Sequence, residues 1–361
     1  MSLPLLFVGL LTQAWAGTVR VDVLDVGQGD SILIRTPANK AILIDASDNQ
    51  AKVPALLTAL GVTALDLVIA THPHADHIGG MDEVLDAFPV KNYIDSGLPH
   101  TTATYAAVMS RVEAKKIPYR TGLTGMSFNL DDGAVLEILF PTGTPLKDTR
   151  SDLNSNSVVA RLTHGDDCFL FPGDAEEPTE RALVAAGLAQ CDVLKVPHHG
   201  SNHSSTPAFL AAVKPSIAVI SVGTGNRYGH PGEETLGRLA GTGAAIYRTD
   251  LMGTVTLLSD GKKIKVETQH PSTAVADAAP PTEPRATTQA ASVHAVEKLT
   301  PAAAEAVPPN ACPYPASASS EVFHEEGCGN AEKISAANLV CYATREQAVK
   351  AGRRPAGCCK P

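Results

Sequence analysis

Thr71-His72-Pro73-His74-Ala75-Asp76-His77 is the stretch that decides the fold, and it directly follows an apolar run, Leu67 to Ala70. Three imidazoles and one carboxylate lie within six residues here, and these are ligand types that Zn²⁺ and Mn²⁺ take in proteins. In an extended chain the first two histidines share one face, whereas the carboxylate and the last histidine lie beyond the bend. The stretch therefore predicts a metal site at the end of a strand, with donors for two ions.

Further metal ligands follow two later apolar runs. Asp174 ends Phe171-Pro172-Gly173-Asp174, and two histidines stand in Lys195-Val196-Pro197-His198-His199-Gly200-Ser201. Because α/β sites are built at the carboxyl ends of strands, we expect both segments to reach the first cluster. Alone, Asp174 could simply cap the helix expected from Pro178. Together with the histidine cluster, it is better explained as a ligand that bridges two ions.

Composition limits the classes of protein that remain. The chain has 361 residues, enough for two domains or one large domain with appendages. With 44% hydrophobic and 19% charged residues, wholesale disorder, collagen and coiled coils are excluded. A net charge of −9, most of it in residues 17–269, excludes a broad basic surface for nucleic acid. An aromatic content of 4% excludes an extended base-stacking surface.

The N-terminus predicts export. Residues 1–16 carry an apolar stretch followed by Ala14-Trp15-Ala16, which is typical of a signal-peptide cleavage site. We expect a secreted or periplasmic protein that begins after Ala16; a disordered or strand-forming N-terminus is the alternative. No later stretch approaches the ~18 apolar residues of a membrane span, so none is expected in the mature protein. The sequence leaves the oligomeric state open.

Residues 17–269 alternate short β-branched runs with helix-like segments, which indicates a layered α/β protein. The expected strands are Val19 to Leu24, Ser31 to Arg35, Ala41 to Asp45, Leu67 to Ala70, Val158 to Leu162, Cys168 to Phe171, Val193 to Val196 and Ile217 to Val222. The expected helices include Val53 to Leu60, Thr104 to Lys116, Pro178 to Gly187 and Glu233 to Ala240. Residues 270–311 hold 13 Ala and 7 Pro and predict a disordered linker.

These motifs together resemble the metallo-β-lactamase fold, an αββα sandwich, and within it the hydrolase domain of the ComEC competence (DNA-uptake) family. The resemblance covers residues 19 to about 260. It rests on Leu24-Asp25-Val26-Gly27-Gln28-Gly29-Asp30-Ser31, Leu43-Ile44-Asp45, the stretch from Thr71 to Gly80, Asn154-Ser155-Asn156-Ser157, Pro172-Gly173-Asp174-Ala175, Lys195 to Ser201 and Arg227-Tyr228-Gly229-His230-Pro231.

The resemblance implies two divalent ions, Zn or Mn, and a set of ligands for each. The first ion would lie on His72 and His74 and the second on Asp76, His77 and His199, with Asp174 bridging both. His199 is preferred over His198 as the ligand, and His198 would then face the substrate. One departure matters: Asn154 to Ser157 replaces the family's usual further histidine, which leaves the first ion poor in ligands.

Two such ions suit phosphodiester hydrolysis, because they activate water and hold the attacking and leaving oxygens. The sequence therefore predicts an exported metal-dependent phosphodiesterase acting on nucleic acid, with DNA preferred. Asp76 would orient the attacking hydroxide, while His198 or His230 contacts the phosphate or protonates the leaving group; His230 could instead only cap a loop. Asp30 and Asp45 would support the site.

Alternatives stay open. Ser201, Asn202 and Ser204 suit either phosphate contacts or turns. The enzymatic alternative is a small-substrate hydrolase of the phosphocholine esterase or lactamase and lactonase type, which stays open because the acidic core disfavours binding of a polyanionic polymer. A third hypothesis is a non-enzymatic binding protein whose metals are structural.

Residues 312–361 hold five of the seven cysteines and predict a small metal-bound or disulfide-bonded module. The segment resembles the small metal-binding domain of Ada-type DNA-repair proteins. That resemblance implies a structural zinc on His324, Cys328 and one or both of Cys358 and Cys359. Disulfide bonding suits an exported protein equally well.

Overall fold

The computed structural model divides the chain into two units, Met1–Glu283 and Pro284–Pro361. It describes residues 17–130, 133–271, 314–317, 322–324, 339–342, 345, 348, 354 and 355. The expected signal peptide, nearly all of the expected linker, and Cys328, Cys358 and Cys359 lie outside the described residues.

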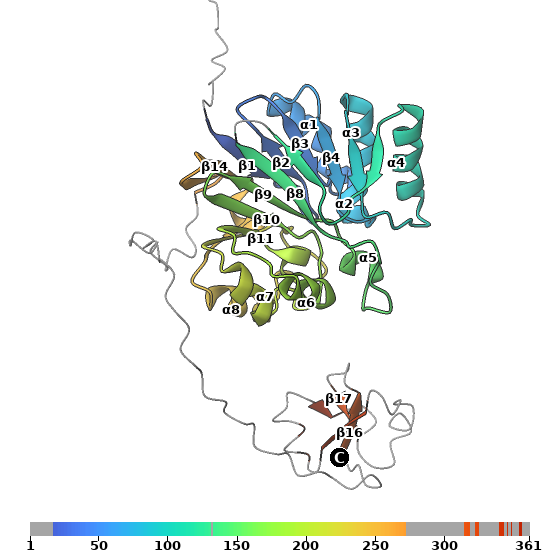
Figure 1. The fold of residues 1–361 in the computed structure, drawn as a ribbon, viewed down its shortest axis with the longest axis vertical. Helices are drawn as coiled ribbons and strands as arrows, with labels where there is room; N and C mark the ends of the chain where they lie inside the picture. The colour runs from blue at the N-terminus through green and yellow to red at the C-terminus, as the bar shows by residue number, and fades with distance from the viewer. Residues whose placement is uncertain are drawn as a thin grey trace, which may run out of the picture. The chain divides into compact units, whose positions relative to one another are not determined.

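Two β-sheets form the body of the first unit (Figure 1). The first sheet has the strand order β15-β14-β1-β2-β3-β4-β5-β6 and the second β13-β12-β11-β10-β9-β8-β7. The first comprises β1 (Val19–Val23), β2 (Ile32–Arg35), β3 (Ala41–Ile44), β4 (Leu67–Ala70), β5 (Tyr93–Asp95), β6 (Tyr119–Thr121), β14 (Val255–Ser259) and β15 (Ile264–Thr268). The second comprises β7 (Ser127–Asn129), β8 (Ala134–Phe140), β9 (Val159–His164), β10 (Asp167–Phe171), β11 (Val193–Lys195), β12 (Ile217–Ile220) and β13 (Ala245–Arg248).

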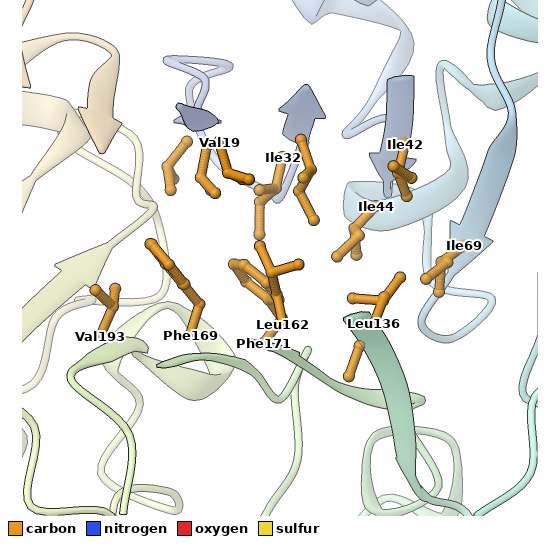
Figure 2. Packing of buried hydrophobic residues seen from close by; sticks show 14 of the residues in the cluster. Val19, Ile32, Ile42, Ile44, Ile69, Leu136, Leu162, Phe169, Phe171 and Val193 are labelled. Carbon is orange, nitrogen blue, oxygen red and sulfur yellow. The ribbon is translucent and has the colours of Figure 1, made fainter. Parts of the chain in front are cut away.

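The sheets face each other across a layer of buried hydrophobic side chains. Figure 2 shows Val19, Ile32 and Ile42 of the first sheet opposite Leu162 and Phe169 of the second. All five are at most 1% exposed. Burial on this scale accounts for the pairing of the sheets, because each buried large side chain contributes about 1.5–3 kcal/mol.

Helices cover the outer face of each sheet (Figure 1). Three longer helices pack on the first sheet through a second hydrophobic cluster and three on the second sheet through a third. The first group is α1 (Val53–Ala59), α3 (Met81–Ala87) and α4 (Ala103–Ala114); the second is α6 (Glu177–Ala185), α7 (Pro207–Val213) and α8 (Glu233–Ala240). The shorter helices are α2 (Ala75–Ile78), α5 (Asp152–Ser155), α9 (Thr249–Met252), η1 (Asn49–Ala51) and η2 (Pro197–Gly200). The layers therefore run helix, sheet, sheet, helix, which confirms the expected αββα sandwich.

The helices expected from the sequence each begin within one residue of the observed start. Their starts carry local signals: Thr102 caps α4 by accepting from the backbone N–H of Tyr105, and α1 and α6 have Pro in the first turn. None of the helices formed by described residues has both the length and the apolar character that a membrane span requires.

The sequence analysis missed strand β8, because its outward positions are partly apolar. Inward and outward positions alternate along Ala134–Phe140, yet Val135 and Leu139 stand on the half-buried side. The alternation of hydrophobic and polar residues that identifies a strand is therefore hidden here. Strands β5, β6 and β7 have three residues each, which is too short for any period to emerge.

Two of the seven cysteines, Cys168 and Cys191, form a disulfide within the first unit. In the second unit β16 (Tyr314–Ser317), β17 (Val322–Phe323), β18 (Leu339–Tyr342) and β19 (Arg354–Pro355) form a sheet in the order β18-β16-β17-β19. Ala316, Phe323 and Ala348 are buried there together. The choice between zinc and disulfides in this unit stays a prediction.

Replacing Phe169 with alanine tests the inter-sheet core. Phe169 is fully buried between the sheets, so Phe169→Ala should lower the free energy of unfolding by about 3–5 kcal/mol. Urea denaturation, followed through the unfolding transition of the first unit, measures this loss. The matched control is Phe128→Ala on strand β7, where the side chain is only half-buried and the expected loss is smaller. Equal losses for the two variants would contradict this account of the core.

Candidate metal centre

The candidate ligands lie on loops that leave the carboxyl ends of strands in both sheets. His72 and His74 follow β4, and Asp76 and His77 lie in the short helix α2 that comes next. The second sheet contributes Asp174 after β10, and His198 and His199 after β11. The expected convergence therefore occurs, and it joins the two sheets at one edge.

Four of these side chains form a compact group of metal donors. Asp76, His77, Asp174 and His199 each offer one ligand atom, and the four atoms lie within 4.8 Å of one another. His77 Nε2 is 3.2 Å from Asp174 Oδ1, and His199 Nε2 is 3.6 Å from that oxygen and 3.5 Å from Asp76 Oδ2. Donors about 2.0–2.2 Å from one Zn²⁺ would be spaced in this way.

The buried atoms of this group also lack other partners. His77 Nε2, Asp174 Oδ1 and His199 Nε2 are buried and make no hydrogen bond. Buried polar atoms in proteins are nearly always satisfied, and a bound ion is one established reason for an exception. The donor set therefore fits the divalent ion that the sequence predicts at this position.

The other oxygen of Asp174 faces a second, looser set of donors. His72 Nε2 lies 3.9 Å from Asp174 Oδ2 and 3.0 Å from His74 Nδ1. His198 Nε2 lies 3.7 Å from the same oxygen. Asp174 therefore lies between two sets of donors. Among the described residues, neither His72 nor His74 belongs to a group whose ligand atoms all lie within 4.8 Å of one another. That Asp174 bridges two ions stays a prediction.

Consecutive left-handed residues bring both His198 and His199 into the site. Their φ angles are 52° and 53°, which non-glycine residues adopt rarely. His199 lies in the four-donor group and His198 lies beside the opposite oxygen of Asp174. The sequence analysis treated one of them as the ligand, whereas the structure brings both rings to Asp174. The preference for His199 stays a prediction.

A carboxylate and a carbonyl behind two histidines hold their imidazole rings in place. Asp45 lies 2.7 Å from His77 Nδ1 and also accepts from the backbone and hydroxyl of Thr71 at 2.7 Å. His199 Nδ1 lies 3.0 Å from the carbonyl of Ser221. Such partners fix the orientation of metal-binding imidazoles.

Asp30 lies behind His199 without a hydrogen bond to it. Its Oδ1 is 3.4 Å from His199 Nδ1 and makes no hydrogen bond, and its other oxygen forms a fully buried ion pair with Lys195. The supporting role of Asp30 and Asp45 stays a prediction.

Burial and neighbouring charges shift the pKa values of the histidines in opposite directions in the two donor sets. Burial lowers the pKa of His72 well below its usual value, and burial also lowers the pKa of His198 to about 4. Burial opposes the charged form of His199, but Asp174 and Asp30 outweigh it and raise its pKa to about 9. Burial likewise opposes ionisation of Asp174, yet His77 and His199 hold its pKa well below the usual range. Negative charge at Asp174 is therefore strongly favoured.

Glu176 is a site residue that the sequence analysis missed. Its Oε1 is 3.5 Å from His198 Nδ1 and accepts from Asn154 Nδ2 at 3.3 Å, and the residue is 2% exposed. Asn154 Oδ1 is buried without a partner. Glu176 and Asn154 therefore both lie beside the His198 ring, and Asn154 Nδ2 is 3.4 Å from His198 Nε2. The only signal in the sequence was a second carboxylate two residues after Asp174.

The Gly27–Asp30 segment is a tight turn against α2, as expected. Gly29 has φ 132°, and a Cβ there would collide with the backbone carbonyl of Asp76. The backbone N–H of Asp30 donates to the same carbonyl at 3.1 Å. The segment therefore fixes the helix that carries Asp76.

An open cavity of about 620 Å³ leads to the centre. Asp174, His198 and His199 line it, together with His230 and Arg150. His230 lies beside His198, with ring centroids 5.7 Å apart. This places His230 within the site rather than on a remote loop, although Asn226 also accepts from its backbone N–H.

The side chains of the serine- and asparagine-rich loop after His199 form hydrogen bonds with backbone groups of the loop itself and of two neighbouring segments. Ser201 Oγ accepts from the backbone of His203, and Asn202 Oδ1 accepts from that of Thr235. Ser204 Oγ donates to the carbonyl of Ala175. These bonds favour turn formation over phosphate binding.

Comparison with known proteins matches residues 24–224 to the model of the metallo-beta-lactamase superfamily. The chain is similar to ComE operon protein 3 of Bacillus subtilis, with 29% identity over 65% of this chain and 32% of that protein. It is similar to competence protein ComA of Neisseria gonorrhoeae, with 34% identity over 64% and 31%. Recombination protein 2 of Haemophilus influenzae shows 31% identity over 70% and 30%. The chain thus spans about a third of the length of these relatives.

Removing the charge behind His77 should weaken metal binding. In Asp45→Asn the acceptor of the His77 ring N–H is impaired, and we expect the affinity for Mn²⁺ or Zn²⁺ to fall about 10–100-fold. Calorimetric titration of the metal-free protein measures it. Glu267→Gln, which alters an exposed carboxylate paired with Lys265, is the control and should bind as the wild type does. Unchanged affinity in Asp45→Asn would show that this contact does not support the centre.

Proposed function

The chain belongs to the metallo-beta-lactamase superfamily of metal-dependent hydrolases, and from this premise we propose that it is an exported phosphodiesterase that cleaves nucleic acid, with DNA as the preferred substrate. The observation that carries the proposal is the placement of Asp174. One of its oxygens faces His77 and His199 and the other faces His72 and His198, at the floor of an open cavity.

This arrangement supports the ligand assignment that the family resemblance implies. His72 and His74 would hold one ion, Asp76, His77 and His199 the second, and Asp174 both. Two such ions supply Lewis acidity and activated water, which is the chemistry that phosphodiester hydrolysis needs. Asp76 is 28% exposed in its side chain, the most open of the carboxylates in this group, and would orient the attacking water.

The cavity offers polar groups for a phosphate. His198 and His230 lie beside each other on its wall, and either ring nitrogen would donate to a non-bridging oxygen or to the leaving group. Arg150 lines the same cavity with a side chain that is 51% exposed; its guanidinium lies 4.0 Å from Glu176 and would have to turn from that carboxylate to bind a substrate anion. A phosphodiester would thus find cations at the cavity although the protein as a whole is acidic.

Nucleic acid as the substrate is supported by the names of the relatives. Two are competence or ComE proteins and a third is a recombination protein. Export and a binding role of residues 312–361 are likewise parts of the proposal, drawn from the apolar N-terminus and from the basic residues Lys350, Arg353, Arg354 and Lys360. The tail, stabilised by zinc or by disulfides, would hold nucleic acid for the catalytic unit.

The direct test is nuclease activity of the purified protein. With Mn²⁺ or Zn²⁺ it should cleave plasmid or linear DNA, and His74→Ala should reduce the rate at least about 100-fold because one ion loses a ligand. His270→Ala replaces an exposed histidine outside the cavity lining and should retain activity.

Inactivity on DNA and RNA with several metals would overturn the proposal. Exclusive turnover of a phosphocholine ester, a β-lactam or a lactone would assign the centre to a small substrate instead. A single inert ion, with no activity after chelation and reloading, would favour a binding protein.

Deleting residues 272–361 tests the role of the tail. Truncation at this point keeps His270, whose backbone N–H donates to the carbonyl of Met252. If the tail holds substrate, the deletion should raise the apparent KM on long DNA and change the turnover of a small phosphodiester little, because tethering acts through local concentration. Loss of both activities would show that the tail is required by the catalytic unit itself.

A further inference from the structure

The loop from Asn226 to Pro231 presents an aromatic ring at the mouth of the cavity. Tyr228 is 50% exposed, and its ring is stacked on that of His230 with centroids 5.8 Å apart and an interplanar angle of 17°. The His230 ring in turn lies beside that of His198, with centroids 5.7 Å apart, and His198 Nε2 is 3.7 Å from Asp174 Oδ2. A continuous line of rings therefore leads from the candidate metal centre to the surface.

Among the large apolar side chains that the described part of the chain exposes, Tyr228 alone lines this cavity. The others are Tyr119, Leu123 and Leu251. The exposed half of an aromatic ring contributes nothing to folding, since that surface stays in water. Its location next to the centre therefore suggests a ligand with a flat apolar face.

The loop holds Tyr228 in a fixed position. Asn226 Oδ1 accepts from the backbone N–H groups of Tyr228 and His230 at 3.1 and 3.0 Å, and its amide donates to the carbonyls of Gly223 and His230. A ring that is held before binding loses little conformational entropy when a ligand stacks on it.

A cation accompanies the ring. The guanidinium of Arg227 lies 5.0 Å from the Tyr228 ring centroid and donates to its hydroxyl at 2.9 Å. Both side chains are exposed, so the guanidinium is able to leave the ring for a phosphate. An aromatic face with an adjacent cation, beside a phosphodiester site, matches the two parts of a nucleotide.

We propose that Tyr228, supported by His230, binds an unpaired base adjacent to the scissile phosphate, with Arg227 on the neighbouring phosphate. The inference rests on the proposed function and adds that the nucleic acid is bound as a single strand. A base within a duplex is already stacked on both faces and cannot lie on this ring, so the site selects single strands or frayed ends. One ring suffices for one base, which is consistent with the low aromatic content of the chain.

Steady-state kinetics on two substrates test the inference. Tyr228→Ala should raise the KM for a short unpaired oligothymidylate about tenfold more than it changes that for methyl p-nitrophenyl phosphate, which carries no base. Tyr228→Phe keeps the ring and should restore the wild-type KM. Tyr119→Ala is the matched control, because that tyrosine is 41% exposed and lies outside the cavity.

A spectroscopic measurement reports stacking without turnover. In Tyr228→Trp, with Ca²⁺ in place of the activating metal, the oligonucleotide should quench the indole fluorescence saturably. The same strand in a duplex should quench it far less. Saturable quenching by a protein that cleaves no nucleic acid would support the base site while the nuclease proposal fails.

Three results would overturn the base site. The first is equal loss of activity of Tyr228→Ala on both substrates. The second is an oligonucleotide KM unaffected by Tyr228→Ala. The third is absence of quenching in a protein that cleaves the oligonucleotide, which would leave the nuclease proposal intact.

Discussion

The charge of Asp174 is the constraint on which the site depends. Its side chain is 3% exposed and lies among His72, His77, His198 and His199. A buried carboxylate needs compensating charge, because desolvation costs several kcal/mol per ion. The imidazoles, and the divalent ions for which their nitrogens are arranged, provide that compensation. The positions of the surrounding loops follow from the need to surround this group.

The same requirement ties the two sheets together. Lys195 ends strand β11 of the second sheet, and it pairs with Asp30 from the loop after β1 of the first. Both are 1% exposed, and a buried pair of this kind adds geometric specificity more dependably than stability. Because Asp30 also faces His199, the position of this candidate ligand is coupled to the packing of the two sheets. The hydrophobic layer in Figure 2 stabilises the sandwich, and this pair orients it.

Sequence reasoning predicted those parts of the site that follow strands. Strand β4 and helix α8 have the expected bounds. The loops after β10 and β11 lie together because these parallel strands end at one edge, and the loop after β4 meets them from the other sheet. It preferred His199 but did not foresee that both rings would reach Asp174, since the consecutive positive φ angles that aim them have no sequence signal outside glycine. Glu176 was missed because its role depends on contact with His198 across the loops rather than on spacing.

An acidic protein that acts on a polyanion must bind through short-range contacts. The Debye length is about 8 Å at physiological salt, so the net charge of −9 is largely screened beyond the cavity rim. Within that distance the substrate would meet the ions on Asp174, the cations of Arg150 and Arg227, and the Tyr228 ring. Few phosphates are then neutralised by the protein, and affinity would depend on salt less steeply than in proteins with long basic grooves. With the proposed substrate, recognition would therefore be concentrated at the cavity, and the acidic surface elsewhere would disfavour unproductive binding.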